Sequence, residues 1–496
     1  MAPVSSALHV ASSVFVIALL IRVCLWIGST SRILGLIVWS GVALRLAAGL
    51  GLFMISYTDS AFLRGVHTGD GFWSLAPDAR VYYDLAARVG ASGWSAVQGG
   101  GPSPLFSRAL GYWFVALGTH VPSAIMFNLA CYVATCAALV YTCRQELRGE
   151  GWPLQSGATA AAVVVMFTYS PMLVLTSTQV LKDTFFALLI VLACLGTVAN
   201  LTSLSTEPEG RYSAFGASLL VIFTAIYGIA GIRAYYALLM CAAYTVAFVM
   251  VCLIAAKGRR MSVAGLGIGS LVVIYLAFRL GAGPYYDGYK QLAANTFPDV
   301  PAALGYVPRA LGAPGAPGAP GPAVSSTFNE TPVPTTVEPS GLESILTFRN
   351  GFVRSGGGTN LAATDSGMDL RNVVVDVSRG LLATFVPISL LEALSIVSLN
   401  GGGGFLAVTD ADTLFLDLGL IAVGTIIWRD RRRLRGGLPA MAFLALLAIV
   451  SALLLGYVVT NYGTLFRLRL LAVVPAWLTP LAILREVSLR DPRRAI

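Results

Sequence analysis

Long apolar runs constrain this chain more than any other feature of its sequence. Each run is close to the ~20 residues that an α-helix needs to cross a bilayer. The runs cover residues 8–28, 33–56, 121–142, 155–174, 181–202, 212–231, 234–256, 262–280, 411–428, 437–459 and 468–485. Apolar residues make up 56% of the chain and charged residues 11%, which is more apolar surface than a soluble domain can bury. The sequence therefore predicts an all-α, polytopic transmembrane bundle of about eleven spans.

The positive charge of the chain gives its expected orientation. The net charge is +9, and basic residues concentrate in short segments between spans, where they act as an orientation signal rather than as a nucleic-acid surface. The most basic segments contain Arg144 and Arg148, Lys257 through Arg260, Arg429 through Arg435, and Arg490 through Arg494. Because such segments stay in the cytoplasm, we expect the N-terminus outside and the C-terminus inside.

This topology divides the chain into three regions. Residues 1–280 form an N-terminal transmembrane module that includes a first outer loop at 57–120. Residues 281–410 form an extracytoplasmic region, in which the Pro/Gly-rich segment 310–340 is expected to be disordered. Residues 411–496 supply the C-terminal transmembrane helices.

Two apolar stretches are not counted as spans. The stretch 106–119 is short and follows Pro104, so we expect an interfacial helix in the first outer loop. The stretch 379–399 contains Pro387 and Glu392, and counting it would place the next basic loop on the wrong side of the membrane.

A charged segment at 77–89 stands out in the first outer loop. Asp78 follows a proline and suits the N-cap of a helix. Asp78 and Tyr82 lie one turn apart, so their side chains would face the same space. Residues at helical spacing predict one apolar face made of Val81, Leu85 and Val89, and the helix would lie along the membrane surface.

Further ionisable residues fall at the expected outer ends of spans. They are Lys182 and Asp183 at the start of the fifth span, Arg233 between the sixth and seventh, Arg279 at the end of the eighth, and Arg467 and Arg469 at the outer end of the tenth. Charged groups at membrane depth are costly and often mark functional sites.

Each of these charges also has a purely structural interpretation. In that interpretation Asp78 is a helix cap and nothing more, Lys182 and Asp183 pair with each other, and Arg233 extends its charge to the membrane interface. Two arginines on the outer side oppose the usual charge bias, so Arg467 and Arg469 favour an anion site. Asp84 is expected to pair with Arg80 and Arg88 on its own helix. Arg45 lies in mid-span and needs a partner that the sequence does not identify.

These residues carry a family resemblance. The run Asp78-Ala79-x-x-Tyr82-x-x-Leu85-Ala86 after an early span resembles the first outer loop of the GT-C superfamily, polytopic glycosyltransferases that use polyprenyl-phosphate-linked sugars. Leu181-Lys182-Asp183, Arg233 and Asn461-x-Gly463-Thr464-x-x-Arg467-x-Arg469 look like GT-C-like proteins of bacterial surface-polysaccharide pathways.

The resemblance implies a role for each matching residue. Asp78 would be the catalytic base of an inverting transfer, with Tyr82, Lys182, Asp183, Arg233, Arg279, Arg467 and Arg469 binding substrate. Ala79 stands where some GT-C families have a second acidic residue, which leaves open whether a divalent metal ion takes part. The three histidines and seven cysteines offer no metal-binding spacing of their own.

The sequence thus predicts a glycosyltransferase in the bacterial cytoplasmic membrane, acting on its extracytoplasmic side. Its partners would be a polyprenyl-phosphate-linked sugar, a glycan, lipid or protein acceptor, and membrane lipid, but no nucleic acid. Two alternatives stay open. One is a polysaccharide polymerase or ligase, in which Asp78 would matter less than Arg467 and Arg469. The other is a transporter or flippase of lipid-linked sugars, which requires polar residues along a path through the bilayer.

Overall fold

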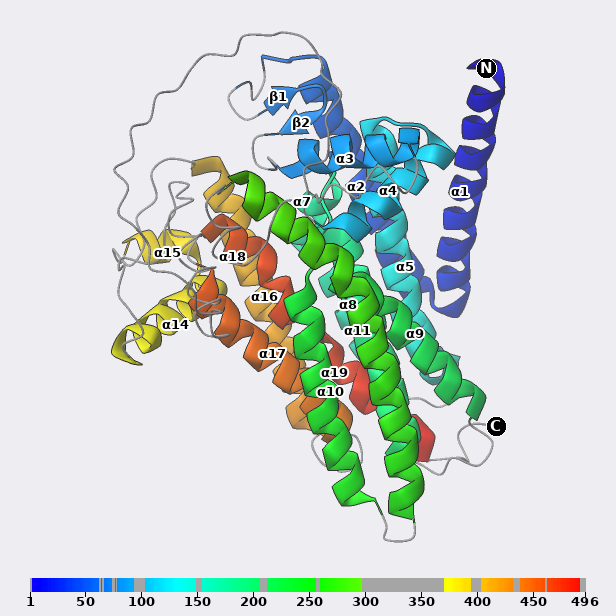
Figure 1. The fold of residues 1–496 in the computed structure, drawn as a ribbon, viewed down its shortest axis with the longest axis vertical. Coiled ribbons are helices and arrows are strands. Elements are labelled where there is room, and N and C mark those ends of the chain that lie inside the picture. The colour runs from blue at the N-terminus through cyan, green and yellow to red at the C-terminus, as the bar shows by residue number, and fades with distance from the viewer. Residues whose placement is uncertain are drawn as a thin grey trace.

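The computed structural model describes residues 2–61, 64, 67–73, 76, 78–92, 103–148, 154–205, 212–255, 259–296, 370–393, 403–430, 438–459 and 462–490. The segment 310–340, expected to be disordered, lies outside the described residues. Nearly all of the described chain is helical, and the helices form one bundle (Figure 1).

The elements follow one another in a simple order. They are α1 (Ala2–Thr30), α2 (Arg32–Tyr57), β1 (His67–Gly69), β2 (Phe72–Trp73), α3 (Asp78–Ser92), α4 (Pro104–Leu117), α5 (Val121–Arg148), α6 (Leu154–Tyr169), α7 (Pro171–Ser177), α8 (Asp183–Ser205), α9 (Tyr212–Ala230), α10 (Ala234–Ile254), α11 (Arg260–Thr296), α14 (Leu370–Phe385), α15 (Ile388–Ala393), α16 (Gly403–Asp430), α17 (Leu438–Val458), α18 (Tyr462–Leu468) and α19 (Leu470–Arg490).

The long apolar helices confirm the predicted class, an all-α polytopic membrane bundle. Within the described residues, ten helices are long and apolar enough to cross a membrane, and the bent pair α6–α7 can supply an eleventh span. Each predicted run overlaps one of these helices. The short helices α14 and α15, separated by a break at Pro387, are not among them.

Two elements differ from the expected spans. The run 155–174 is broken at Ser170, where α6 and α7 meet at an angle of 49°. The residue before a proline is biased away from helical geometry, and Pro171 begins α7. The helix expected to end near 280 continues through Pro284 to Thr296, well past the apolar part of the sequence.

The spans differ greatly in how deeply they are buried. Of the apolar 18-residue stretch in each candidate span, 83% is buried in α8 and 89% in Thr464–Ala482, which joins α18 to α19, so these spans lie at the centre of the bundle. Only 11% is buried in α1, which lies at the edge of the bundle (Figure 1).

One end of the bundle is covered by α3, α4 and the hairpin β1–β2, and we call it the capped end (Figure 1). The sequence analysis did not predict the hairpin. Its turn contains Asp70 at φ 55° and Gly71 at φ 86°, the backbone that Asp-Gly supplies in tight hairpins. The start of α1 also lies at the capped end.

The helix α3 packs on α4 through a face that coincides with the predicted apolar stripe only at Val89. Its buried residues are Ala79, Tyr82, Ala86 and Val89, whereas Val81 is 47% exposed. Small residues explain the choice, because α3 approaches α4 so closely that a Cβ at Gly111 would lie 2.6 Å from the Cβ of Val89. Of the predicted stripe, Val89 packs against α4 and Val81 stays exposed, so the position of α3 along the membrane surface stays a prediction.

Candidate functional site

A cluster of charged side chains from distant parts of the chain forms near the capped end. It contains Asp78 at the start of α3, Lys182 and Asp183 at the start of α8, Arg233 at the N-cap of α10, and Arg467 in α18. We refer to these five residues as the polar cluster. The sequence analysis named all five as candidates.

Arg467 connects the two carboxylates of the cluster. Its Nε and Nη2 donate to the same oxygen, Oδ2 of Asp183, at 3.2 and 2.9 Å. Its Nη1 donates to Oδ2 of Asp78 at 3.0 Å. One guanidinium thus ties α18 to both α8 and α3, in the fork geometry that arginine offers to oxyanions.

The two carboxylates differ in their surroundings. The side chain of Asp183 is 3% exposed and also lies 3.8 Å from Nη2 of Arg233. The side chain of Asp78 is 52% exposed, and its described hydrogen bond is the one from Arg467. Asp183 is therefore a buried carboxylate fixed by two arginines, whereas Asp78 is accessible from outside the protein.

Arg233 has unused hydrogen-bonding capacity. Its Nη1 donates to the hydroxyl of Tyr235 at 3.0 Å, and its guanidinium lies 5.4 Å from the ring centre of Phe186. Its Nε is buried without a hydrogen-bond partner among the described residues. Such a donor normally has a partner, so this atom is available to an oxyanion.

Lys182 lies on the other side of the cluster, against α4 and α3. Its ammonium group donates to the hydroxyl of Ser103 and lies 5.2 Å from the ring centre of Tyr82. Burial, and then the nearby charge of Arg233, lower the pKa of Lys182 to about 7. Burial, and then Asp78, raise the pKa of Tyr82, so the phenol keeps its proton and can donate a hydrogen bond.

Two candidates lie apart from the cluster. Arg279 is exposed on α11 and forms none of the contacts that build the cluster. Arg469 is fully buried, and it donates to Asp412 and to the hydroxyl of Thr413 on α16. Residues two apart on helical backbone point to opposite sides, which explains why Arg467 and Arg469 do not form one site as expected.

Asp412 is a buried residue that the sequence analysis missed. Besides Arg469, it receives hydrogen bonds from the hydroxyl of Ser170 at 2.9 Å and from the backbone N–H of Met172 at 2.7 Å. Asp412 therefore caps the N-terminus of α7 at the break between α6 and α7. Through Arg469 it also holds the start of α19 at this break. The signal that could have identified it is an acidic residue inside an apolar run.

Arg45, left without a partner in the sequence analysis, occupies the other side of this break. Its guanidinium donates to the carbonyl oxygens of Thr168 and Phe167 at 2.7 and 3.1 Å, and it lies 3.8 Å from the ring centre of Tyr132. A cation thus sits at the C-terminal end of α6 and an anion at the N-terminal end of α7, the signs that the helix dipoles favour.

Another predicted pairing is wrong. Arg80 pairs with Asp70 in the hairpin turn at 3.4 Å rather than with Asp84, which is exposed on α3. The turn brings Asp70 across the surface of α3, and nothing in helical spacing could reveal this neighbour.

The sequence does not decide whether a divalent metal ion binds at this site. Among the described residues, no group of three or more His, Cys, Asp and Glu side chains is placed to hold a metal ion. The carboxylates of Asp78 and Asp183 instead face Arg467.

The helices and the polar cluster define an integral membrane protein whose charged residues gather near one end of its bundle. No family model matches the sequence, and neither a curated protein nor a solved structure matches it.

Proposed function

We propose that this chain is a membrane glycosyltransferase that takes a sugar from a polyprenyl-phosphate carrier and transfers it to a glycan, lipid or protein acceptor at the polar cluster. The capped end would then face the extracytoplasmic side of a bacterial cytoplasmic membrane. The observation that carries the proposal is the bridge from Arg467 to Asp78 and Asp183 beside two further cations, Lys182 and Arg233.

The cations suit a lipid-linked phosphate. Arginine forks bind phosphate oxygens in pairs, and Arg233 has a buried Nε without a described partner. As the sugar leaves, negative charge develops on the phosphate, and fixed cations stabilise that charge more in the transition state than in the ground state. Lys182 gains a proton more readily when an anion binds next to it.

The unequal exposure of the carboxylates suggests how the base is released. Arg467 is held to buried Asp183 by two donors, but to half-exposed Asp78 by one. A phosphate that takes the Nη1 donor of Arg467 would free Asp78 and leave the bond to Asp183 in place. Donor binding would thus prepare the base.

The transfer itself needs one base and one leaving group. The acceptor hydroxyl attacks the anomeric carbon of the sugar, the bond from that carbon to the phosphate oxygen breaks, and the electron pair stays on the polyprenyl phosphate. The hydroxyl proton passes to the carboxylate of Asp78. Attack from the face opposite the phosphate inverts the anomeric configuration.

Donor binding tests this proposal. Arg467→Lys keeps the charge but loses the fork, so affinity for a polyprenyl-phosphate sugar should fall roughly 10-fold or more, given the ~1.5–3 kcal/mol of a hydrogen bond to a charged group. Arg279→Lys is the matched control and should bind normally. If Arg467→Lys also binds normally, the phosphate site lies elsewhere, with Lys182 and Arg233 the next candidates.

One observation favours a second candidate, a transporter of lipid-linked sugars. The break between α6 and α7 is typical of transporter helices, and buried Arg45, Asp412 and Arg469 surround it. These charges are bonded to one another or to helix ends, however, so they stabilise the break rather than line a path. Movement of a labelled lipid-linked sugar across proteoliposomes without any transfer would support this candidate over the transferase.

A further inference from the structure

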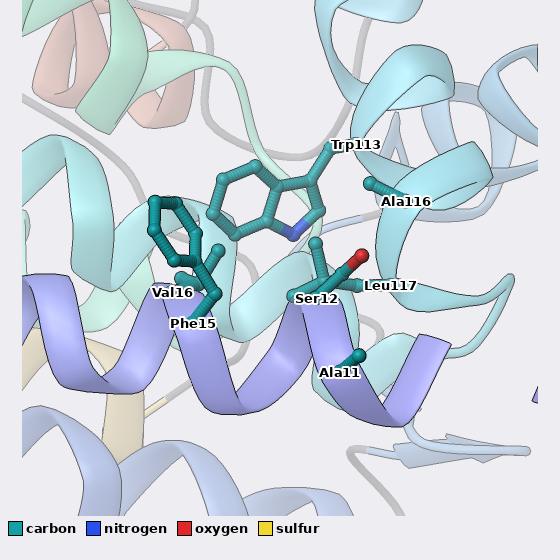
Figure 2. A pocket seen from close by; sticks show the side chains of 7 residues that line it. All are labelled: Ala11, Ser12, Phe15, Val16, Trp113, Ala116 and Leu117. Carbon is teal, nitrogen blue, oxygen red and sulfur yellow. The ribbon is translucent and has the colours of Figure 1, made fainter. Parts of the chain in front are cut away.

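A hollow lies between α1 and α4, away from the polar cluster. Figure 2 shows Ser12, Phe15 and Val16 extending from α1 toward the Trp113 indole on α4. Its volume is about 350 Å³. The lining residues are Ala11, Ser12, Phe15, Val16, Trp113, Ala116 and Leu117.

A second, smaller hollow of about 90 Å³ adjoins the first, and Leu117 lines both. It reaches the start of α5 and is bordered by Ile17 and His120. Apart from Ser12 in the first hollow and three polar residues in the second, the combined walls are apolar. The shape is that of an elongated groove along the outer side of α4.

The surface that contains this groove faces lipid. The helix α1 is a candidate span with most of its side chains exposed, and Phe15 at the groove is 67% exposed. The groove is thus continuous with the membrane-facing surface of the bundle. A gap left empty there would forfeit dispersion contacts, and the apolar molecules present at that depth are lipid chains.

The end of the groove toward the start of α1 carries polar groups. A Cβ on Gly118 would lie 3.3 Å from Nε2 of His120 and 3.5 Å from Nδ1 of His9, so the two rings meet over this glycine. The backbone N–H of Ser123 donates to Nδ1 of His120 at 3.0 Å, so the neutral ring carries its proton on Nε2 and can donate it. Trp113 satisfies its own N–H on the carbonyl of Ser123 at 2.8 Å.

We propose that this groove binds one phospholipid from the leaflet on the capped side. An acyl chain would lie between Phe15 and Trp113, and a phosphate or ester oxygen would accept the hydrogen bond from Nε2 of His120. The site does not depend on the proposed transferase. Ser103, which contacts Lys182, and Leu117 at the groove lie at opposite ends of α4, ~20 Å apart at 1.5 Å per residue, so the lipid is distinct from a donor held in the cluster.

Native mass spectrometry of delipidated protein with palmitoyl-oleoyl phosphatidylglycerol tests the site. Ala116→Trp places an indole in the groove, whereas Val115→Trp adds the same side chain on the exposed face of α4. The wild type and Val115→Trp should retain one tightly bound lipid, and Ala116→Trp should lose it. His120→Ala should weaken retention by several-fold.

A second groove-filling variant provides for the case in which the first does not fold. If Ala116→Trp does not give a monodisperse protein, Ser12→Phe fills the groove from the α1 side and should likewise lose the lipid. Unchanged retention in the groove-filling variants, or no retained lipid in the wild type, would overturn the proposal. Displacement of the bound phospholipid by equimolar polyprenyl phosphate would also overturn it, because the groove would then belong to the carrier.

Discussion

Arg467 has two carboxylate partners that differ in how readily they can be released. Its bond to Asp78 uses one donor at a half-exposed carboxylate, while the bond to Asp183 uses two donors at a buried one. Exposed ion pairs contribute about 0–1 kcal/mol, whereas removing one partner of a buried pair costs about 3–5 kcal/mol. A ligand would therefore displace Asp78 first.

In the proposed function, Lys182 should make donor binding depend on pH. Its neighbours in the cluster are Arg233, Asp183, Arg467 and Asp78, and its pKa is lowered to about 7. An anion binds better to the protonated amine, so affinity for the donor should fall as pH rises from 6 through about 7 to 8.

The control for this pH dependence is Lys182→Arg, which stays charged throughout this range. Binding by the variant should be nearly flat between pH 6 and 8 when measured by donor titration. A wild-type affinity that does not change over the same range would contradict a role for Lys182 in binding the phosphate.

The same pKa predicts a stability effect of definite sign. The unfolded chain binds the proton of Lys182 up to about pH 10.4, while the folded protein releases it near pH 7. The unfolded state therefore binds more protons above pH 7, and this residue alone makes the protein more stable as pH rises between these values. Comparing the melting temperatures of the wild type and Lys182→Met across this range isolates the contribution.

Among the elements, the break between α6 and α7 depends on Asp412. This carboxylate joins α7, α16 and α19 through Ser170, Met172 and Arg469. Asp412→Asn leaves Arg469 charged and uncompensated in the bundle, so we expect a loss of about 3–5 kcal/mol, measured as thermal unfolding in detergent. Asp70→Asn, which breaks the exposed pair with Arg80, should change stability by less than about 1 kcal/mol.

A double variant separates the ion pair from the cap on α7. Arg469→Met combined with Asp412→Asn removes both charges and should recover a large part of the lost stability, because the cost lies in the unpaired cation. If the single and double variants have the same melting temperature, the role of Asp412 is to cap α7 rather than to balance the charge of Arg469.

The spans were predictable from the sequence, but the contacts among them were only partly so. Apolar length determines where helices cross. The positions of charges at the ends of spans were enough to identify Lys182 and Arg467 as candidates, and the charged segment in the first outer loop identified Asp78. The mid-bundle partners of Arg45 and Asp412 were not predictable, because these contacts depend on the break at Ser170 and on the packing of helices far apart in the chain. Helical spacing alone should have separated Arg467 from Arg469.

The face of α3 shows the same limit. The spacing of the larger apolar residues indicated one stripe, but α4 approaches through a glycine and packs on the side with Ala79 and Ala86. The choice between the two faces depends on the partner helix, which periodicity does not reveal.

The basic loops predict the orientation of the bundle in the membrane. Positive loops stay in the cytoplasm, so cysteines introduced at Gly151 and Gly436 should be protected from a membrane-impermeant maleimide in intact cells, while one at Ser325 should react. Labelling of Gly436 from outside would reverse the orientation and place the polar cluster on the cytoplasmic side, away from an extracytoplasmic donor.

In the proposed transferase, Asp78 is the cluster residue that takes part in sugar transfer, because the other four can bind a phosphate without catalysing the transfer. Asp78→Asn keeps the size of aspartate, but it cannot accept the proton of an acceptor hydroxyl. Asp78→Ala removes the carboxylate from the first turn of α3, where a negative charge contributes about 0.3–1 kcal/mol, and Asp84→Asn, on the exposed side of α3, should stay active.

The decisive measurement is sugar transfer from a polyprenyl-phosphate donor by Asp78→Asn, with donor binding and melting temperature recorded on the same preparation. We predict a rate at least ~10²-fold below the wild type, a nearly unchanged melting temperature and donor affinity equal to or above that of the wild type, since Arg467 is then less occupied. Normal turnover by Asp78→Asn would contradict the assignment of Asp78 as the base. Normal turnover by Asp78→Asn together with an inactive Arg467→Lys would favour a polymerase or ligase that relies on its arginines.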